Sequence, residues 1–497
     1  MSAGTDTKDL SEVTHLDNAV GAKGAADVNE VEMNHQTHHG MDREVAKYAA
    51  EHTVILTPEE NNRLFKLINK RILTYMLVTY CWETLDKNTL SYAAVMGIKQ
   101  DANLTAVQYG WLSTIVYLAE LVFQYPVNRM FQSLPVARTI SVAVICWGIV
   151  VALTPLCHDF AGLMAVRGLL GTFETAIQPG FTLLTSDVVR ARRTGADDRP
   201  LVFHYQGVMK NWQLMFMILG ILTVVWGFTA LFWVPDSPTS AKCYSEEDKR
   251  LMVERMRSNQ NLQNKEFKWY QAKEALTDPH LWAYAALNVL VTLPSGGVSS
   301  YNGLITEALG FTALQTDLLA MASGAFSLTA TLIAIVFYRF TRWTLGSAAF
   351  CILPQLACVI TMMSGVLVAY YLFQFIGPQV IIQISLVTQN VAGGTKKSIA
   401  IAMTWAGSMI GNCIGPQVFS TSSPPRYLKG FAVCLGMYSL SLVILAWLGL
   451  SYKVINHRRD KQRAALRDGD ASERPEDLDN AFDDMTDREN PNFRYNY

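Results

Sequence analysis

Charged side chains are scarce in this 497-residue sequence, where Asp, Glu, Lys and Arg together make up 17 %, against about 25 % in soluble globular proteins. The shortage is uneven, because residues 1–71, 236–278 and 453–497 hold 20, 16 and 20 of the charged residues. Only 27 charges, or 8 %, are left for the other 338 residues. So few charges could not cover a soluble domain of that size, which argues against a soluble enzyme and for long membrane-embedded segments.

The signatures of several other protein classes are missing as well. A net charge of −1, with no basic face that alternates with aromatic residues, argues against a nucleic-acid partner. The 8 cysteines show no paired spacing and no CxxC motif, so we expect neither a disulfide framework nor a structural zinc site. The sequence holds no HExxH, GxSxG or phosphate-binding loop, and we therefore expect no enzymatic activity, no metal and no cofactor.

What the sequence does contain is a series of apolar runs long enough to cross a bilayer as helices. The runs are continuously apolar over 20 or more residues, which excludes the strands of a β-barrel, since those alternate over about ten residues. The predicted fold class is all-α, a multi-pass membrane protein with five spans before a charged central loop and six after it. The expected spans are residues 72–97, 107–131, 139–157, 160–185, 212–235, 280–308, 314–338, 343–363, 366–390, 397–420 and 428–452.

The same pattern divides the chain into five parts and orients them. Every second loop between the spans is basic, including the one at Lys396 and Lys397, which places both termini and the central loop in the cytosol. The five expected parts are a disordered cytosolic tail at 1–70, an N-terminal transmembrane bundle at 71–236, a cytosolic central loop at 237–278, a C-terminal transmembrane bundle at 279–452 and a disordered cytosolic tail at 453–497.

One stretch of the first half conflicts with this orientation. The basic cluster between Arg190 and Arg199 and the central loop should both be cytosolic, so an even number of spans must lie between them. Only the span at 212–235 does, and residues 201–211 are too few to cross at 1.5 Å per residue. The sequence therefore predicts that one helix is absent or that residues 187–211 are irregular.

Charges inside the predicted spans are candidates for function, because each costs at least about 2.5–3.5 kcal/mol at mid-bilayer. Glu83, Asp86 and Lys87 share one helix face at spacings of three and four residues. They could have a functional role beside a water-filled cavity, or they could form a structural ion pair. In the next span Glu120 and Gln124 lie one turn apart. Glu120 is a candidate proton carrier, because burial favours a neutral carboxyl group, although pairing with a charge on another helix is equally open.

The fourth span carries the strongest pattern, a stripe formed by Arg167, Gly171, Glu174 and Gln178. The stripe combines a cation, a gap for close backbone approach, a carboxylate and an amide. Arg167 could hold an anionic substrate or stabilise a deprotonated carboxylate. A direct bridge from Arg167 to Glu174 is not expected, because seven residues span about 10 Å along a helix.

The second half has no charges inside its spans, and its candidates are polar or helix-breaking residues. Asn288, Ser295, Gly296 and Asn412 could line a cavity, because glycine and proline interruptions, such as the run Pro294–Asn302, let backbone face a cavity. The alternative is helix packing through small residues.

The arrangement and several motifs resemble the major facilitator superfamily, and within it the fungal anion:cation symporters of the allantoate permease-like group. The stretches that carry the resemblance include Leu85–Tyr92, Tyr125–Arg129, Arg167–Gly180, Val234–Pro238, Val253–Gln260, Pro294–Gly297, Ser385–Lys397, Gly411–Gln417 and Pro425–Tyr427. The resemblance implies two helical bundles and proton-coupled uptake of a small organic anion, such as allantoate or a vitamin carboxylate. It also implies a monomer in the plasma membrane that uses the proton gradient and needs no other cofactor.

The resemblance assigns residues and exposes departures. Arg167 matches the arginine of the fourth-helix motif, and Asp86 and Lys87 match a pair on the first helix. Asn128 replaces an acidic residue of the family, and a fifth helix is missing before Trp212. A chain without that helix could instead be a nutrient sensor that does not transport, or a transport-defective truncated product.

Overall fold

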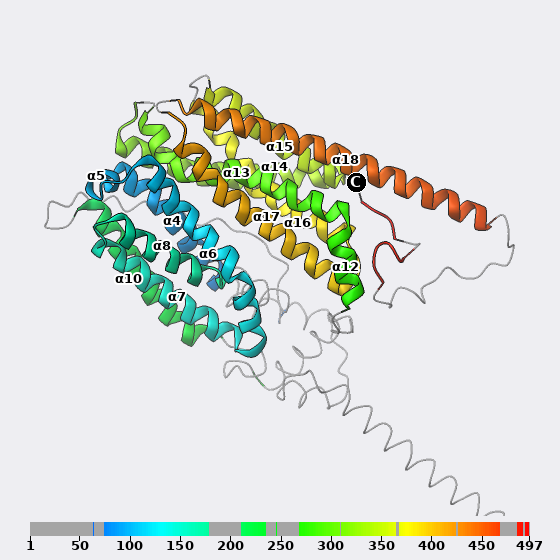
Figure 1. Ribbon diagram of the computed structural model, residues 1–497, viewed down its shortest axis with the longest axis horizontal. Helices are drawn as coiled ribbons and strands as arrows, with labels where there is room; N and C mark the ends of the chain where they lie inside the picture. The colour runs from blue at the N-terminus through cyan, green and yellow to red at the C-terminus, as the bar shows by residue number, and fades with distance from the viewer. Residues whose placement is uncertain are drawn as a thin grey trace, which may run out of the picture. The chain divides into compact units, whose positions relative to one another are not determined.

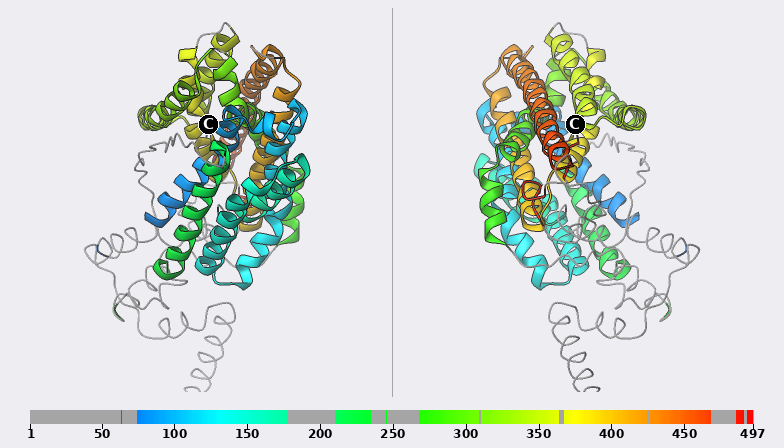
Figure 2. Two further views of the ribbon diagram at one scale, coloured as in Figure 1. Left: turned by 90° about the vertical axis from the view of Figure 1, so that its left-hand side faces the viewer. Right: turned by 90° about the vertical axis from the view of Figure 1, so that its right-hand side faces the viewer.

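In the computed structural model, the described part of the chain is helical (Figure 1; Figure 2 shows two further views). The structure describes residues 74–177, 210–234, 268–308, 310–363, 367–423, 426–467, 485–490 and 493–496, together with residues 63 and 245. The elements are α4 (Thr74–Val95), α5 (Ile98–Asp101), α6 (Ala106–Ser133), α7 (Val136–Leu153), η2 (Thr154–Leu156), α8 (Phe160–Glu174), α10 (Asn211–Trp233), α12 (Trp269–Thr277), α13 (Pro279–Ala308), α14 (Ala313–Thr341), α15 (Thr344–Met363), η3 (Leu367–Phe375), α16 (Ile376–Asn390), α17 (Gly394–Ser420) and α18 (Leu428–Arg467).

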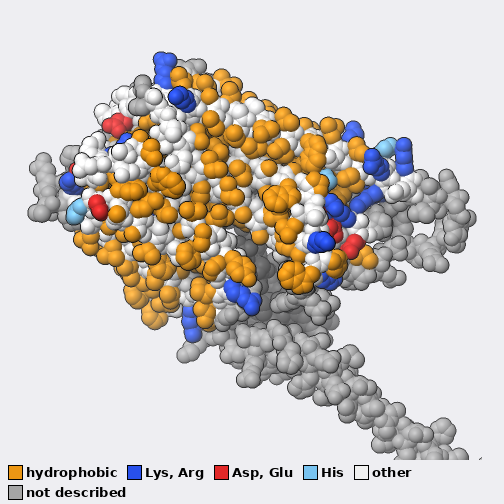
Figure 3. All heavy atoms as spheres, in the orientation of Figure 1, with side chains coloured by type: hydrophobic (Ala, Val, Ile, Leu, Met, Phe, Trp, Pro, Cys, Tyr) orange, Lys and Arg blue, Asp and Glu red, His pale blue; other side chains and the backbone are white. Residues whose placement is uncertain are grey.

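Most of these helices can cross a membrane. Within the described residues, 9 helical segments are long and apolar enough to do so. Helix α4 is continuous, but three charged residues break its apolar sequence, and α8 is described over only 15 residues. Apolar side chains cover the side of the helical body, and charged side chains gather toward its ends (Figure 3). This distribution suits a body surrounded by lipid.

Two corners of the chain are built in the same way, one in each half. Helix α6 begins with Thr105 and Gln108, and α14 begins with Thr312 and Gln315; each pair forms a reciprocal capping box. A glycine with positive φ precedes each corner, Gly97 at 100° and Gly310 at 94°. Glycine adopts this conformation without the steric cost that other residues meet. The repeat of these local signals relates α4–α6 to α13–α14 and indicates two similar halves.

Within each half, helices approach closely where glycine removes a side chain. A Cβ on Gly220 of α10 would lie 2.7 Å from the Cα of Ala152 of α7, and one on Gly415 of α17 would lie 2.5 Å from the backbone nitrogen of Gly297 of α13. Such distances leave no room for a side chain, so these pairs pack backbone against backbone.

The two halves meet through α4 and α6 on one side and α13 and α17 on the other. Hydrogen bonds join Tyr109 Oη to the carbonyl of Ser300 (2.8 Å), the backbone nitrogen of Gly303 to Ser91 Oγ (2.8 Å) and Thr114 Oγ1 to a carbonyl of α17 (2.9 Å). These contacts use the last turns of α4 and α13 and the first turns of α6. We call this end of the bundle, where α4 finishes and α6 begins, the joined end; α13 and α17 begin at the opposite end.

The structure corrects the expected C-terminal tail. Residues 453–497 were expected to be disordered, but α18 continues to Arg467, and residues 485–490 and 493–496 fold against helices of the second half. The end of the expected central loop also forms a helix, α12. The expected tail at 1–70 lies outside the described residues apart from residue 63, and so do residues 178–209, where the missing helix was predicted.

Candidate functional site

A half-buried lysine surrounded by carboxylates lies inside the first half. Lys87 Nζ of α4 is 2.7 Å from Glu83 on the same helix, 3.3 Å from Glu174 of α8 and 3.9 Å from Glu120 of α6. All three carboxylate residues are buried, with 2–5 % of their surface exposed. Lys87 therefore forms the ion pair on its own helix, and it also supplies a partner on another helix for Glu120.

Arg167 of α8 lies nearby and has unused hydrogen-bonding capacity. It is 4 % exposed, and its guanidinium lies 5.3 Å from the centre of the Phe216 ring of α10, an arrangement typical of a cation–π contact. Its Nη2 finds no hydrogen-bond partner among the described residues. Glu174 pairs with Lys87 and not with Arg167, as the seven-residue separation predicts. Arg167 therefore offers a buried cationic donor that another group can occupy.

Asp86 interacts electrostatically with Arg167 but is held by other residues. Trp147 Nε1 of α7 donates to its Oδ2 at 3.0 Å, and Thr89 Oγ1 lies 3.4 Å from its Oδ1. These contacts fix the carboxylate beside the arginine. Asp86 thus orients the site without neutralising Arg167 in a direct ion pair.

Four of these charged residues, Asp86, Lys87, Arg167 and Glu174, face a common cavity, whose lining does not include Glu83 or Glu120. Helices α4, α6 and α8 of the first half and α13 of the second half line it. Its polar lining includes Asp86, Lys87, Tyr117, Arg167, Glu174 and Ser300. Gly171 brings α8 close enough for this, because a Cβ there would lie 2.9 Å from the Cα of Val116 of α6. The predicted gap in the stripe is thus a site of close backbone approach.

Other predicted residues lie elsewhere. Gln124 is half-buried farther along α6 and is not part of the cavity lining, and Gln178 lies outside the described residues. Asn288 donates to the carbonyl of Tyr284 (3.1 Å) and accepts from Ser408 Oγ (3.1 Å). It therefore ties α13 to α17.

The remaining second-half candidates also lie at the contact between α13 and α17. A Cβ on Gly296 would lie 2.8 Å from the Cα of Asn412, and Ser295 is half-buried beside it. None of the three lines the cavity. Their placement fits packing through small residues, the alternative reading of this pattern.

Several residues of the site were not predicted from the sequence. Ser113 and Tyr117 line the cavity, and their spacing from Glu120 of seven and three residues places all three on one helix face, a signal that could have been used. Ser299 and Ser300 also line the cavity, and they belong to the run Pro294–Asn302, which was expected to be able to face one. Trp147 gave no sequence signal, because only the packing of α7 against α4 brings it to Asp86.

The site has the character of a binding cavity. Within the described ranges, no group of three His, Cys, Asp or Glu side chains is placed to hold a metal ion. The arrangement provides a cationic donor for an anion and carboxylates that can exchange protons.

Comparison with known proteins identifies the architecture. A family model described as Major Facilitator Superfamily matches residues 76–196 and 200–416. Two solved structures share the fold at low sequence identity. A bacterial homologue of the human lysosomal transporter Spinster, in an inward-facing and unoccupied conformation, has a TM-score of 0.52 at 13 % identity and covers 77 % of this chain and 95 % of its own. The nucleoside transporter NupG has a TM-score of 0.51 at 8 % identity and covers 76 % and 98 %.

Curated relatives extend over most of the chain. An uncharacterised transporter, C417.10 of Schizosaccharomyces pombe, is 32 % identical over 468 residues and covers 88 % of this chain and 90 % of its own. The allantoate permease of Saccharomyces cerevisiae is 29 % identical over 483 residues (88 % and 87 %), and the thiamine pathway transporter THI73 of the same yeast is 30 % identical over 469 residues (88 % and 87 %).

Proposed function

Because this chain belongs to the Major Facilitator Superfamily, whose model matches most of its length, we propose that this membrane transporter is a proton-coupled carrier for a small organic anion. The superfamily and fold are those of transporters and not of enzymes. The substrate class we propose is a carboxylate such as allantoate or a vitamin carboxylate. The allantoate permease among its relatives supports this choice.

The observation that carries the proposal is the free donor of Arg167 beside the lysine–carboxylate cluster. Within the part of the chain that the structure describes, Arg167 Nη2 has no hydrogen-bond partner, which is costly for a buried arginine, and a substrate carboxylate would supply two acceptors that match its planar donors. Lys87 lines the same cavity and adds positive charge. An anion would therefore bind at Arg167, within reach of the cluster.

The cluster also supplies a reason for proton coupling. Glu83, Glu120 and Glu174 surround one ammonium group, and neighbouring carboxylates in a buried site disfavour each other's ionisation. Protonation of one carboxylate removes a negative charge from the cavity and so favours entry of an anion. By thermodynamic linkage, anion binding favours protonation to the same extent.

Transport requires the cavity to open to each side of the membrane in turn. The joined end closes the contact between the halves at one side, and rocking of the halves about the site would expose it alternately. Basic residues in every second loop support cytosolic termini, which would make the joined end the outer one. We propose the plasma membrane as the location and a monomer as the transporting unit.

Uptake by intact cells tests the proposal. Cells that express the chain would be given radiolabelled allantoate, nicotinate, pantothenate or biotin, one at a time. We expect at least one to accumulate above its external concentration, and a protonophore to collapse that accumulation. Arg167→Gln should abolish it, whereas Arg339→Gln, which removes an exposed charge from α14, should not. Accumulation that persists with the protonophore present would overturn proton coupling.

The predicted absence of a helix favours a second candidate. The family match is split into two segments at residues 197–199, inside the stretch where that helix was expected. A chain without it could bind a nutrient as a sensor, or be a transport-defective product. Saturable binding of a labelled substrate without accumulation would favour the sensor, and loss of both would favour the defective product. Resequencing the transcript over the codons for residues 186–212 would show whether the segment is genuinely absent.

A further inference from the structure

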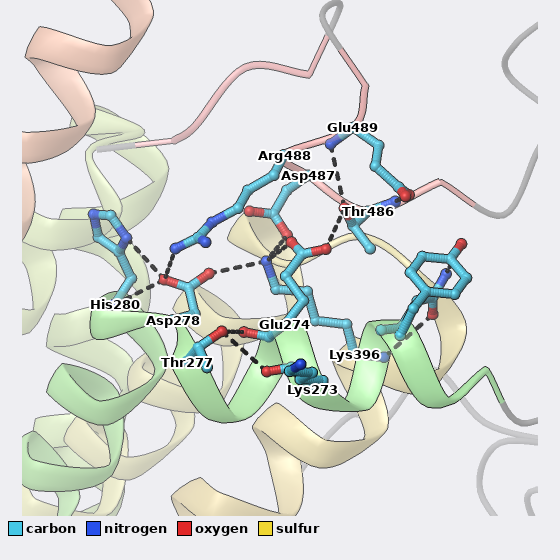
Figure 4. Close-up of polar contacts among 12 residues, drawn as sticks. Lys273, Glu274, Thr277, Asp278, His280, Lys396, Thr486, Asp487, Arg488 and Glu489 are labelled. Carbon is cyan, nitrogen blue, oxygen red and sulfur yellow. Dashed lines mark hydrogen bonds and ion pairs between the residues drawn. The ribbon is translucent and has the colours of Figure 1, made fainter.

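The C-terminal segment of the chain returns to the helical body and completes a second buried charge cluster (Figure 4). Lys396 of α17 is fully buried, and its Nζ lies 2.7 Å from Asp487 of this segment, 2.8 Å from Glu274 of α12 and 2.9 Å from Asp278. Arg488 adds a contact of 3.0 Å to Asp278. The segment thus contributes one carboxylate and one guanidinium to a cluster that α12 and α17 begin. We call residues 485–490 and 493–496 the strap.

The strap has local structure of its own at this contact. The backbone nitrogen of Thr486 donates to Glu489 Oε2 (2.9 Å), and the backbone nitrogen of Glu489 donates to Thr486 Oγ1 (3.2 Å). Thr486 Oγ1 in turn donates to Glu274 Oε2 at 3.0 Å. This reciprocal capping fixes the turn that presents Asp487 and Arg488 to the cluster.

Aromatic stacking anchors the other end of the strap. The ring of Tyr495 stacks on Tyr452 of α18, with centroids 4.7 Å apart and planes 3° from parallel. The ring of His280 lies beside both, 5.2 Å from Tyr452 and 6.3 Å from Tyr495. Tyr495 Oη donates to Asp487 Oδ2 at 2.6 Å, so the aromatic anchor and the charge cluster are joined within the strap.

Backbone groups of the strap are also bound by specific side chains. The backbone nitrogen of Asn496 donates to Asn390 Oδ1 of α16 (2.7 Å), and Asn456 of α18 bonds both the nitrogen (3.1 Å) and the carbonyl (2.9 Å) of Tyr495. Arg459 donates to the carbonyls of Phe493 (2.5 Å) and Asp487 (2.7 Å). These side chain–backbone hydrogen bonds show that the strap is bound at a specific site.

The strap binds at the ends of the helices that join the two halves. Its footprint covers α12, the beginnings of α13 and α17, the end of α16 and residues 452–459 of α18, all in the second half. Helices α13 and α17 contact α4 and α6 at the joined end, and α13 also lines the cavity through Ser299 and Ser300. A clamp on the beginnings of α13 and α17 therefore acts on the helices that must move when the halves rock.

We propose that the strap is an intramolecular clamp that holds helices of the second half in their described spacing and so restrains the rocking of this half against the first. A ligand shifts an equilibrium between two states only through contacts that differ between them, so the restraint requires rocking to change the spacing of the five helices that the strap joins. The strap is tethered to α18, so it rebinds at high effective concentration, and release and docking are reversible. Of the measurements that test the clamp, only uptake rests on the proposed function; hydrogen exchange and the distance measurement do not.

Hydrogen exchange tests whether the strap docks as described. In the full-length protein in nanodiscs, the hydrogen-bonded amides of Thr486, Glu489, Tyr495 and Asn496 should be protected, and Asp487→Asn and Tyr495→Ala should each accelerate their exchange about tenfold or more. Lys461→Gln, which removes an exposed charge from α18, is the control and should change nothing. Both variants lie outside the membrane helices, so the body should still fold. Unprotected strap amides in the unmodified chain would overturn the proposal.

A distance measurement tests the clamp itself. Spin labels at Asn128 of α6 and Lys397 of α17 report the separation of the halves opposite the joined end. Tyr495→Ala should add a population at shorter distance, and a distribution that stays unchanged although the strap has been released would contradict a clamp. If uptake is established, the same variant should raise its rate about twofold or more. Absence of uptake in every variant would count against the proposed function and leave the exchange and distance results to decide the clamp.

Discussion

Two lysines of this chain each lie among three carboxylates, one in each half, but their surroundings differ. Lys87 keeps 28 % of its side chain exposed, borders a cavity and lies near Arg167, which has an unused donor. Lys396 is fully buried, and Arg488 and the strap close its cluster. The cluster in the first half therefore borders a cavity with room for a ligand. At the cluster in the second half, residues of the chain itself occupy the corresponding position.

Solvent exposure and charge balance explain why the two clusters can differ in role. The Lys87 cluster has an excess of carboxylates beside a cavity, so gain of a proton or an anion can change its charge. In the Lys396 cluster, Asp278 is already stabilised as an anion. Burial alone would raise the pKa of Asp278, but hydrogen bonds from His280 and Lys396 and the nearby charge of Arg488 hold it well below its usual range. Such a cluster fixes a structure in place.

The sharpest test of the comparison is to remove each lysine charge. We expect Lys396→Gln to lower the free energy of unfolding by about 3–5 kcal/mol, because it leaves buried carboxylates without their cation. Lys87→Gln should cost less, because its carboxylates can take up protons from the cavity. Thermal unfolding in detergent measures both, with Lys397→Gln as the control. Equal losses for Lys87→Gln and Lys396→Gln would show that the clusters do not differ in this way.

The second test removes the free donor that sets the first cluster apart. Arg167→Gln should reduce uptake about 100-fold, since hydrogen bonds to charged groups contribute up to about 3 kcal/mol each. Initial uptake rates under the conditions above measure the effect, at matched amounts of protein in the membrane. Arg167→Lys should restore only part of the rate, because an ammonium group cannot bind a carboxylate through two parallel bonds. Full activity in Arg167→Gln would remove the arginine from the site.

A third test addresses the packing that forms the cavity. Gly171→Ala should destabilise the protein by about 1–3 kcal/mol and lower uptake, because its Cβ would meet the backbone of α6. Gly168→Ala, one turn earlier on α8, is the control, since a Cβ there meets only a side-chain atom of Ile115 at 3.6 Å. Thermal stability and uptake of the two variants should diverge. If they match, close approach at Gly171 does not shape the site.

A smaller effect is expected from neutralising one carboxylate of the first cluster. Glu174→Gln should lower proton-driven accumulation about tenfold, because a fixed amide cannot gain or lose the coupled proton. Counterflow, the exchange of labelled for unlabelled substrate without net proton movement, should be less affected. The ratio of the two rates is the measurement. An equal decrease in both would assign Glu174 to substrate binding or structure.

The smallest effect concerns pH at the second cluster. The lowered pKa of Asp278 means that its stabilising contribution is present above the unfolded value of about 4 and is lost only as pH falls through the folded value below it. Strap protection should therefore persist from pH 8 to pH 5, after correction for intrinsic exchange rates. Loss of protection at pH 6 would contradict this charge assignment.

Much of the fold followed from local patterns in the sequence. The eleven expected spans correspond to helices whose ends lie within a few residues of the predicted ones over most of the chain, because a long apolar run specifies a membrane helix by itself. The six interior charges were identified for the same reason, since a charge in such a run stands out. By contrast, Lys396 was used only as a sign of orientation, because it lies at a helix start beside Lys397, where basic residues are ordinary.

The sequence by itself determined an all-helical membrane transporter and the helix faces that carry its charges, because helical periodicity fixes which residues of one helix share a face. Only the tertiary structure decided which faces meet. It paired Lys87 with Glu120 and Glu174, left Arg167 with a free donor, set Asn288 to hold α13 to α17, and buried Lys396 under the strap. These outcomes depend on distances between segments far apart in the chain, and helix packing sets those distances.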